Sequence, residues 1–319
     1  MHLRRLILST LAAIAFAPAL TIAQVPPLRL LVGFPAGGSA DVTARVLADK
    51  MKDSLGVPVV VENRPGAGGQ IAARAVKDAA PDGNTLMLVP FAVMVIQPMV
   101  FSSVKYDTST DFTAVGNTVI FPLAVAVGPA TPARNLRELT DWFKANADKA
   151  NFGSPAVGSM PHFLGELLSA QTGVKLTHVA YQGGAPMVVN LLGGQIAMGI
   201  DTPAEFAEHH RAGKLRVIAT SGAQRAVQFP DVATLREQGV DVDASAWFGL
   251  FGPAGMPSAV TDRLNAALQS ALKAPDVIER LGRLGLTTAP GSPADMAQRL
   301  ARDKTTWAPA IKASGFKAD

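Results

Sequence analysis

The chain has 319 residues, of which 48% are hydrophobic and 17% charged, and its formal net charge at pH 7 is +4. This composition excludes a disordered chain, because enough apolar side chains are present to form a large core. The sequence contains no cysteine, which excludes disulfides, thiolate metal sites and a cysteine-linked lipid anchor.

The first 23 residues have the pattern of a secretory signal peptide. Arg4 and Arg5 precede the apolar run Leu6 to Phe16, and small residues continue to Ala23. This pattern predicts cleavage after Ala23 and export to the periplasm. Cleavage removes two arginines and lowers the formal charge from +4 to +2. The remaining positive charge is scattered, and no later run of eighteen apolar residues occurs, so we expect neither a nucleic-acid partner nor a membrane anchor.

Apolar strands alternate with amphipathic helices in the first part of the mature chain. The expected strands are Leu28–Val32, Val57–Val61 and Thr85–Val89. The expected helices are Ala40–Asp53, which Gly56 should terminate, and Gln70–Asp78. Such alternation is typical of a parallel sheet with helices on both faces.

The same alternation resumes near Leu123. The expected strands are Leu123–Val127, Asn151–Gly153, Leu176–Val179, Ile196–Ile200 and Leu215–Thr220. The expected helices are Leu136–Ala145, Met160–Thr172, Ala185–Leu192 and one that begins at Pro203 and ends before Gly213. Thr202-Pro203-Ala204-Glu205 has the pattern of a capping box at the start of the last of these.

Beyond Trp247–Phe251 the chain becomes helical, over Pro257–Lys273, Pro275–Leu284 and a final helix capped by Ser292. No flexible linker separates the two halves, so we predict two lobes joined by crossover strands near Leu123–Val127 and Trp247–Phe251. The first lobe would contain residues 24–124 plus 249–319, and the second residues 125–248. A ligand is expected in the cleft between them.

Two glycine-rich turns follow the first two strands. The first contains Phe34, Pro35, Ala36, Gly37, Gly38 and Ser39, with Asp41 in the helix behind it, and the second is Glu62–Gly69. Backbone N–H groups at the start of a helix favour anions such as carboxylates. Two such turns predict one anionic small molecule held mostly by the backbone. The alternative is that the glycines only allow tight turns.

Three loops of the expected second lobe share this arrangement and are topologically able to face the same cleft. His162 is either a donor to the ligand or a packing residue, and Tyr181 can wall a pocket. Asp201 either binds an ammonium group or a bridging water, or compensates the dipole of the next helix. The candidate ligand-binding residues of these loops are Ser154, Val157, Gly158, Ser159, His162, Tyr181, Gly183, Gly184 and Asp201.

Motifs for nucleotides and catalysis are missing from the sequence. The Gly66 turn has Ile71 where a dinucleotide fingerprint has its third glycine, and no Gly-Lys-Ser/Thr occurs. There is no G-x-S-x-G or H-E-x-x-H motif, and two S-x-x-K matches lack their partner motifs. His209 and His210 are adjacent, so on a helix they face different directions. We therefore expect no cofactor, no metal site and no enzymatic activity.

In order along the chain, the motifs resemble the Bug family, the TctC-like extracytoplasmic solute receptors of tripartite tricarboxylate transporters. The resemblance covers essentially the whole mature sequence. The matching segments are 34–41, 62–69, 81–83, 181–186, 191–195, 212–216, 247–250 and 253–257.

This resemblance implies a type II periplasmic-binding-protein fold, an α/β architecture of two lobes that close on a ligand. The loops Phe34–Gly38, Ser154–Ser159 and Tyr181–Gly184 would then surround a carboxylate. The implied function is to capture a dicarboxylate, amino acid or aromatic acid, as a monomer, for the membrane subunits of a transporter. Ala156 stands where the family usually has glycine, and Gln182 where lysine is common.

Two other functions stay open at the level of sequence. The protein could pass its ligand-bound state to the periplasmic domain of a sensor kinase, or it could be an exported enzyme that uses the same fold. The first would be distinguished by the neighbouring genes and the second by turnover of a bound acid.

Overall fold

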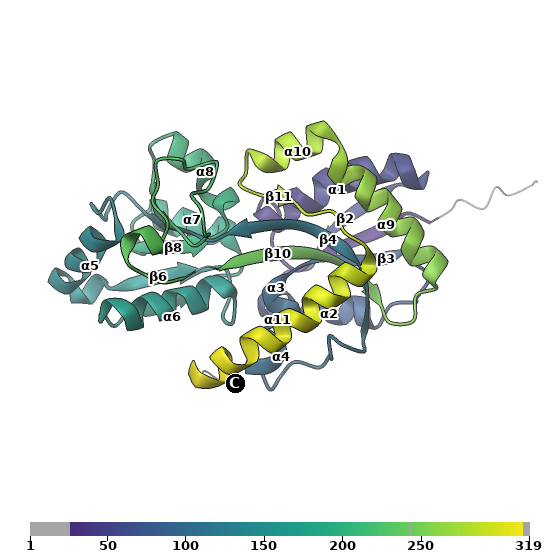
Figure 1. Cartoon of the computed structure of the whole chain (residues 1–319), viewed down its shortest axis with the longest axis horizontal. Helices are drawn as coiled ribbons and strands as arrows, with labels where there is room; N and C mark the ends of the chain where they lie inside the picture. The colour runs from purple at the N-terminus through teal and green to yellow at the C-terminus, as the bar shows by residue number, and fades with distance from the viewer. Residues whose placement is uncertain (1–25, 243, 315–319) are drawn as a thin grey trace, which may run out of the picture.

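The structure is a computed structural model that describes residues 26–242 and 244–314. The molecule is elongated, and two lobes lie side by side along its long axis (Figure 1). Each lobe has its own β-sheet. The long strands β4 (Phe112–Pro122) and β10 (Ser245–Pro253) run along the middle of the molecule toward the second lobe. The predicted signal peptide, residues 1–23, lies outside the described residues.

The sheet of the first lobe has the strand order β11-β4-β10-β3-β1-β2. Strand β1 pairs in parallel with β2 and β3, whereas β10 pairs antiparallel with β3 and β4. Besides β4 and β10, its strands are β1 (Leu28–Val32), β2 (Val59–Asn63), β3 (Thr85–Pro90) and β11 (Thr287–Thr288).

The sheet of the second lobe has the order β7-β6-β8-β5-β9. Strand β6 pairs in parallel with β7 and β8, and β5 pairs antiparallel with β8 and β9. Its strands are β5 (Ala124–Val127), β6 (Asn151–Ser154), β7 (Thr177–Ala180), β8 (Met198–Asp201) and β9 (Arg216–Thr220).

Helices cover both sheets. Those of the first lobe are α1 (Ser39–Leu55), α2 (Gln70–Lys77), α3 (Phe91–Met94), α4 (Gln97–Val100), α9 (Ser258–Lys273), α10 (Pro275–Gly282) and α11 (Pro293–Ser314). Those of the second lobe are α5 (Leu136–Ala145), α6 (Met160–Thr172), α7 (Gly184–Leu192) and α8 (Pro203–Arg211). Short 3-10 turns occur at Ala67–Gly69, Ala147–Lys149 and Arg236–Gln238.

Helix α1 illustrates how the sequence specifies an element. Ala40, Ala44, Leu47 and Met51 recur at intervals of three or four residues, and all are buried, as expected for one face of an α-helix. Gly56 follows the helix in the left-handed conformation, with φ of 68°, and its N–H donates to the Lys52 carbonyl. The predicted end of this helix is therefore confirmed.

The expectation of purely parallel sheets is wrong for the strands nearest the crossings. Strand β5 follows β4 with only Leu123 between them. Without a crossover helix, nothing requires β5 to enter the second sheet parallel to its neighbours. Strand β4 was not predicted at all, because Gly116 and Asn117 interrupt its strand-forming residues. The residue boundaries of the two lobes stay a proposal. Because the whole of β10 pairs with β4 in the first sheet, the structure favours a return of the chain from the second lobe to the first just before Ser245.

Aromatic packing fixes the junction between α3, β10 and α11. The ring of Phe91 meets both Trp247 and Trp307 edge-on, with centroids 5.6 Å apart in each pair. The indole N–H of Trp247 donates to Asp303 Oδ2 over 2.7 Å, so the buried tryptophan has its polar atom satisfied. Phe91 and Trp247 of this cluster also line the site described below.

Candidate functional site

A cavity lies between the two lobes, with about 720 Å³ of empty space including the open solvent at its mouth. Its apolar lining comes largely from the junction just described, through Phe91, Phe121, Trp247 and Phe248. Its polar lining comes from the loops at the starts of four helices, together with Gln97 of α4.

The helices α1, α6, α7 and α8 all begin at this cavity. Ser39 and Ala40 open α1, Met160 opens α6, and Gly184 opens α7. Thr202, the N-cap of α8, also lines the cavity. The first N–H groups of a helix lack partners within the helix and carry partial positive charge. Four such ends around one space favour a ligand with an anionic group.

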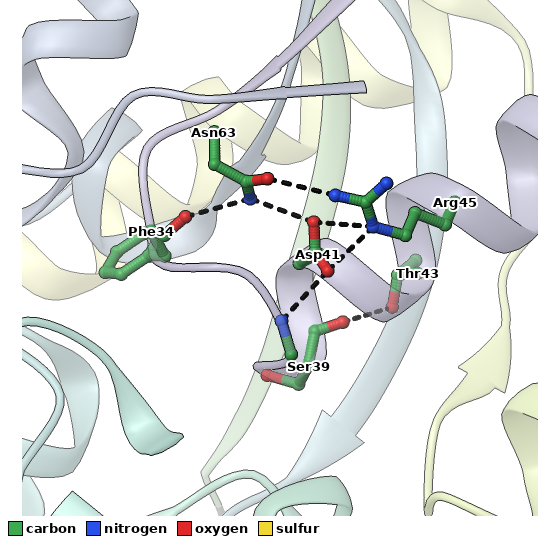
Figure 2. A network of polar contacts seen from close by, with 7 residues as sticks. Phe34, Ser39, Asp41, Thr43, Arg45 and Asn63 are labelled. Carbon is green, nitrogen blue, oxygen red and sulfur yellow. Dashed lines mark hydrogen bonds and ion pairs between the residues drawn. The ribbon is translucent and has the colours of Figure 1, made fainter. Parts of the chain in front are cut away.

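The first glycine turn is held from behind by Asp41. Its carboxylate accepts hydrogen bonds from the Gly37 N–H at 2.9 Å, from Arg45 Nε at 2.9 Å and from Asn63 Nδ2 at 2.8 Å (Figure 2). Asn63 also donates to the Phe34 carbonyl. Burial opposes ionisation of Asp41, but the hydrogen bonds from Arg45, Gly37 and Asn63 keep its pKa below the usual value. Asp41 is therefore an ionised residue that positions the turn and does not line the cavity.

The second glycine turn lies directly against the first strand. A Cβ on Gly33 would come within 2.6 Å of the Gly69 Cα, so only glycine permits this approach. Gly68 reaches the cavity, and its carbonyl accepts a hydrogen bond from Gln97 Nε2 at 2.9 Å. The predicted pair of turns is thus brought to one cavity, which Gln97 also lines.

The serine loop of the second lobe is supported by two stacked histidines. The rings of His162 and His178 lie 3.9 Å apart, and His178 Nε2 is 2.7 Å from Ser154 Oγ. Ser159 Oγ accepts from the His162 N–H, so the prediction that Ser159 caps α6 is confirmed. Burial lowers the pKa of His162 to about 4, and burial together with His162 lowers that of His178 to about 3. Both imidazoles are neutral at neutral pH.

The predicted capping box at α8 is wrong. Glu205 does not return to Thr202; its Oε1 accepts the Ser39 N–H of α1 in the opposite lobe at 2.6 Å. Among the described residues, Thr202 Oγ1 is buried without a hydrogen-bond partner. A helix start from another part of the chain thus takes the carboxylate that the local pattern assigns to α8.

Asp201 stands beside Glu205 at the end of β8. Its Oδ1 accepts the Thr202 N–H at 2.7 Å, whereas its Oδ2 is buried and has no partner among the described residues. Burial, then the neighbouring Glu205, raise the pKa of Asp201 well above its usual value. Burial also raises the pKa of Glu205.

The structure brings about half of the predicted ligand-binding residues to the cavity wall. Those that line it are Phe34, Pro35, Gly38, Ser39, Ser159, Gly183, Gly184 and Asp201. Those that lie behind it or elsewhere in the same loops are Ala36, Gly37, Asp41, Ser154, Val157, Gly158, His162 and Tyr181. Tyr181 packs with a hydrophobic cluster of the second lobe that includes Met187.

Sequence reasoning missed Gln97, Glu205 and the aromatic lining residues. The aromatic residues lie in ordinary apolar runs, and Glu205 had a complete local explanation as a capping residue. In the described part of the chain, no set of three or more histidine and acidic side chains is arranged to hold a metal ion. Likewise, none of the helices that the structure describes is long and apolar enough to span a membrane.

Comparisons with known proteins agree on one family. The family model for the tripartite tricarboxylate transporter family receptor matches residues 43–316. BugT of Bordetella pertussis is 35% identical over 293 residues, which cover 91% of this chain and 90% of that protein.

Two solved structures of similar proteins contain carboxylates. MatC (Rpa3494) from Rhodopseudomonas palustris, with bound malate, is 30% identical, has a TM-score of 0.85 and covers 90% of this chain and 99% of its own. Rpa4515 of R. palustris, with adipate, is 28% identical, has a TM-score of 0.88 and covers 92% of this chain and 98% of its own. Solved relatives also include periplasmic binding proteins. The predicted two-lobed solute-receptor fold is confirmed.

Proposed function

The chain belongs to the family of tripartite tricarboxylate transporter receptors, and we propose that it captures a small carboxylate in the periplasm and delivers it to the membrane subunits of such a transporter. The observation that carries this proposal is the convergence of four helix N-termini on one interlobe cavity. Export follows from the predicted signal peptide.

The backbone supplies the anion-binding character of the cavity. Of the described residues that line it, none is a lysine, arginine or histidine. A ligand carboxylate would therefore be stabilised by the helix dipoles and by the N–H groups at the helix starts that are not already bonded to Asp201 and Glu205. The malate and adipate in the related structures are small acids of this kind.

Contacts across the cavity support capture by closure. The Ser39 N–H of the first lobe bonds to Glu205 of the second, at 2.6 Å. A Cβ on Gly183 would lie 2.9 Å from the Pro35 ring, so the two loops approach closely. The lobes are joined at Leu123 and just before Ser245, which makes these two crossings the proposed hinge.

The side chains around the cavity fit a solute receptor better than they fit an enzyme. The two stacked histidines are neutral and lie behind the serine loop, and Ser154, which bonds to His178, is fully buried. The Ser154–His178 pair therefore does not meet a ligand at the cavity wall.

A thermal-shift assay on the ligand-free mature protein tests the proposal. We expect at least one acid from a panel of C4–C6 dicarboxylates, amino acids and aromatic acids to stabilise the protein. At a hundredfold excess over the Kd the gain would be about 2.7 kcal/mol. The methyl esters of the same acids are the controls, since they lack the charge. Equal responses to acid and ester, or no response to any acid, would contradict carboxylate capture.

A further inference from the structure

The acidic side chains of the cavity wall do not complement a simple dicarboxylate. Its titratable side chains, among the described lining residues, are the two carboxyl groups of Asp201 and Glu205. Helix starts can offset a carboxylate at one end of a ligand, but a second anionic group near these two would meet like charge.

The two carboxyl groups point at the same small region. An ideal Cβ built on Gly184 would lie 2.6 Å from Asp201 Oδ2 and 2.5 Å from Glu205 Oε2. Both oxygens therefore lie close to one point of the cavity lining, beside the first residue of α7. Each carboxyl group has its other oxygen engaged by a backbone N–H, from Thr202 and Ser39 respectively.

Two buried oxygens near this point lack hydrogen-bond partners among the described residues. Asp201 is 4% exposed and Thr202 is 5% exposed. Asp201 Oδ2 and Thr202 Oγ1 have no hydrogen-bond partner among the described residues. A buried carboxylate oxygen without a donor is unfavourable. A hydroxyl of a ligand would satisfy one oxygen, whereas a protonated amine supplies several donors and a charge that compensates both carboxyl groups.

We propose that Asp201 and Glu205, with Thr202, form a subsite for the protonated amine of an amino-carboxylate ligand. The inference rests on the proposed function, because it assigns the second functional group of the same captured acid. In this arrangement the ammonium group would lie between Asp201 and Glu205, the ligand carboxylate would lie toward the start of α6, which neither carboxyl group contacts, and the carbon chain would lie against Phe91 and Trp247.

Matched pairs of ligands test this subsite by isothermal titration calorimetry. The pairs are succinate and aspartate, glutarate and glutamate, and adipate and 2-aminoadipate, which differ only by the amine. We expect the wild-type mature protein to bind the amino compound of at least one pair at least tenfold more tightly. Asp201→Asn and Glu205→Gln should each reduce that preference at least tenfold. Glu208→Gln, on the exposed face of the same helix, should leave it unchanged.

The outcomes separate the subsite from the proposed function. Binding of the simple dicarboxylates with equal or higher affinity would overturn the subsite and leave carboxylate capture intact. A preference for amino compounds that survives in both variants would also overturn it. Failure to bind any of the six acids would overturn the subsite, whereas carboxylate capture would be contradicted only by the wider thermal-shift panel. Circular dichroism of each variant establishes that it is folded, and two independent variants guard against a local folding defect in one.

Discussion

Glu205 of α8 accepts the Ser39 N–H of α1 over 2.6 Å, so a side chain of one lobe caps the first turn of a helix in the other. The helix dipole and the carboxylate charge reinforce this contact. Because Gly38, the N-cap of α1, has no side chain, Glu205 supplies the side-chain acceptor that the helix start itself lacks. The contact therefore acts as a latch between the lobes.

Removing this latch is expected to favour the open arrangement. Glu205→Ala should increase the radius of gyration of the ligand-free protein in small-angle X-ray scattering, because the Ser39 N–H then turns to water. Glu208→Ala is the matched control, since its carboxylate pairs with Arg211 on the surface. Identical scattering from both variants would show that the latch does not hold the lobes.

The pH dependence of the free energy of unfolding should reveal the protonation of Asp201. Its pKa is raised in the folded state, so its contribution to stability is full below the unfolded-state value near 3.8 and is lost as the pH rises through the folded value. In Asp201→Asn the side chain does not titrate, so this loss of stability with rising pH does not occur. The free energy of unfolding of the ligand-free variant, relative to wild type, should therefore rise between pH 4 and pH 8 in urea titrations. A constant difference across this range would contradict a raised pKa.

The stacked histidines His162 and His178 should lower the stability of the protein as the pH falls, which is opposite to the effect of Asp201. Their pKa values are lowered from 6.5 to about 4 and about 3, so the stability that they contribute is present above pH 6.5 and is lost as the pH falls. Each histidine should lower the free energy of unfolding by about 2 kcal/mol between pH 7 and pH 5. The imidazole NMR resonances of His162 and His178 should retain their neutral-form shifts down to pH 5. Titration of either ring near pH 6.5 would contradict this prediction.

Local patterns predicted most elements because their determinants are local. Gly56 ends α1, and Ser292 and Asp295 cap α11 through reciprocal hydrogen bonds. The convergence of loops at one cavity also follows from strand–helix alternation, since strand ends share an edge of the sheet.

The parts that were missed depend on contacts distant in the sequence. The pattern Thr202–Glu205 gave Glu205 a local partner, but in the fold its carboxylate bonds to the helix start at Ser39, 166 residues away. Similarly, nothing in the segment around Gln97 indicates that its amide meets the Gly68 carbonyl. The antiparallel pairing of the crossover strands was not predicted, because it depends on how the two lobes face each other.

Asp41 should matter for binding although it does not line the cavity. Asp41→Ala removes the acceptor for the Gly37 N–H and the partner of Arg45. We expect a loss of about 1–3 kcal/mol in stability, because Gly37, Arg45 and Asn63 lose the ionised acceptor that they share, and weaker ligand binding as the glycine turn loosens. Asp53→Ala on the exposed side of α1 is the control. Unchanged affinity in a folded Asp41→Ala protein would show that the turn is rigid without it.

The geometry at Gly184 gives the sharpest test of the cavity wall. A methyl group there would fall within 2.6 Å of both carboxyl groups, so Gly184→Ala must displace Asp201 and Glu205. We expect ligand affinity measured by calorimetry to fall at least tenfold, together with an increase in the radius of gyration like that of Glu205→Ala. Gly282→Ala is the matched control, because its Cβ would meet no neighbouring atom within 4 Å. Retained affinity in Gly184→Ala would place the ligand away from the start of α7, since a bound ligand there could not tolerate the displaced carboxyl groups.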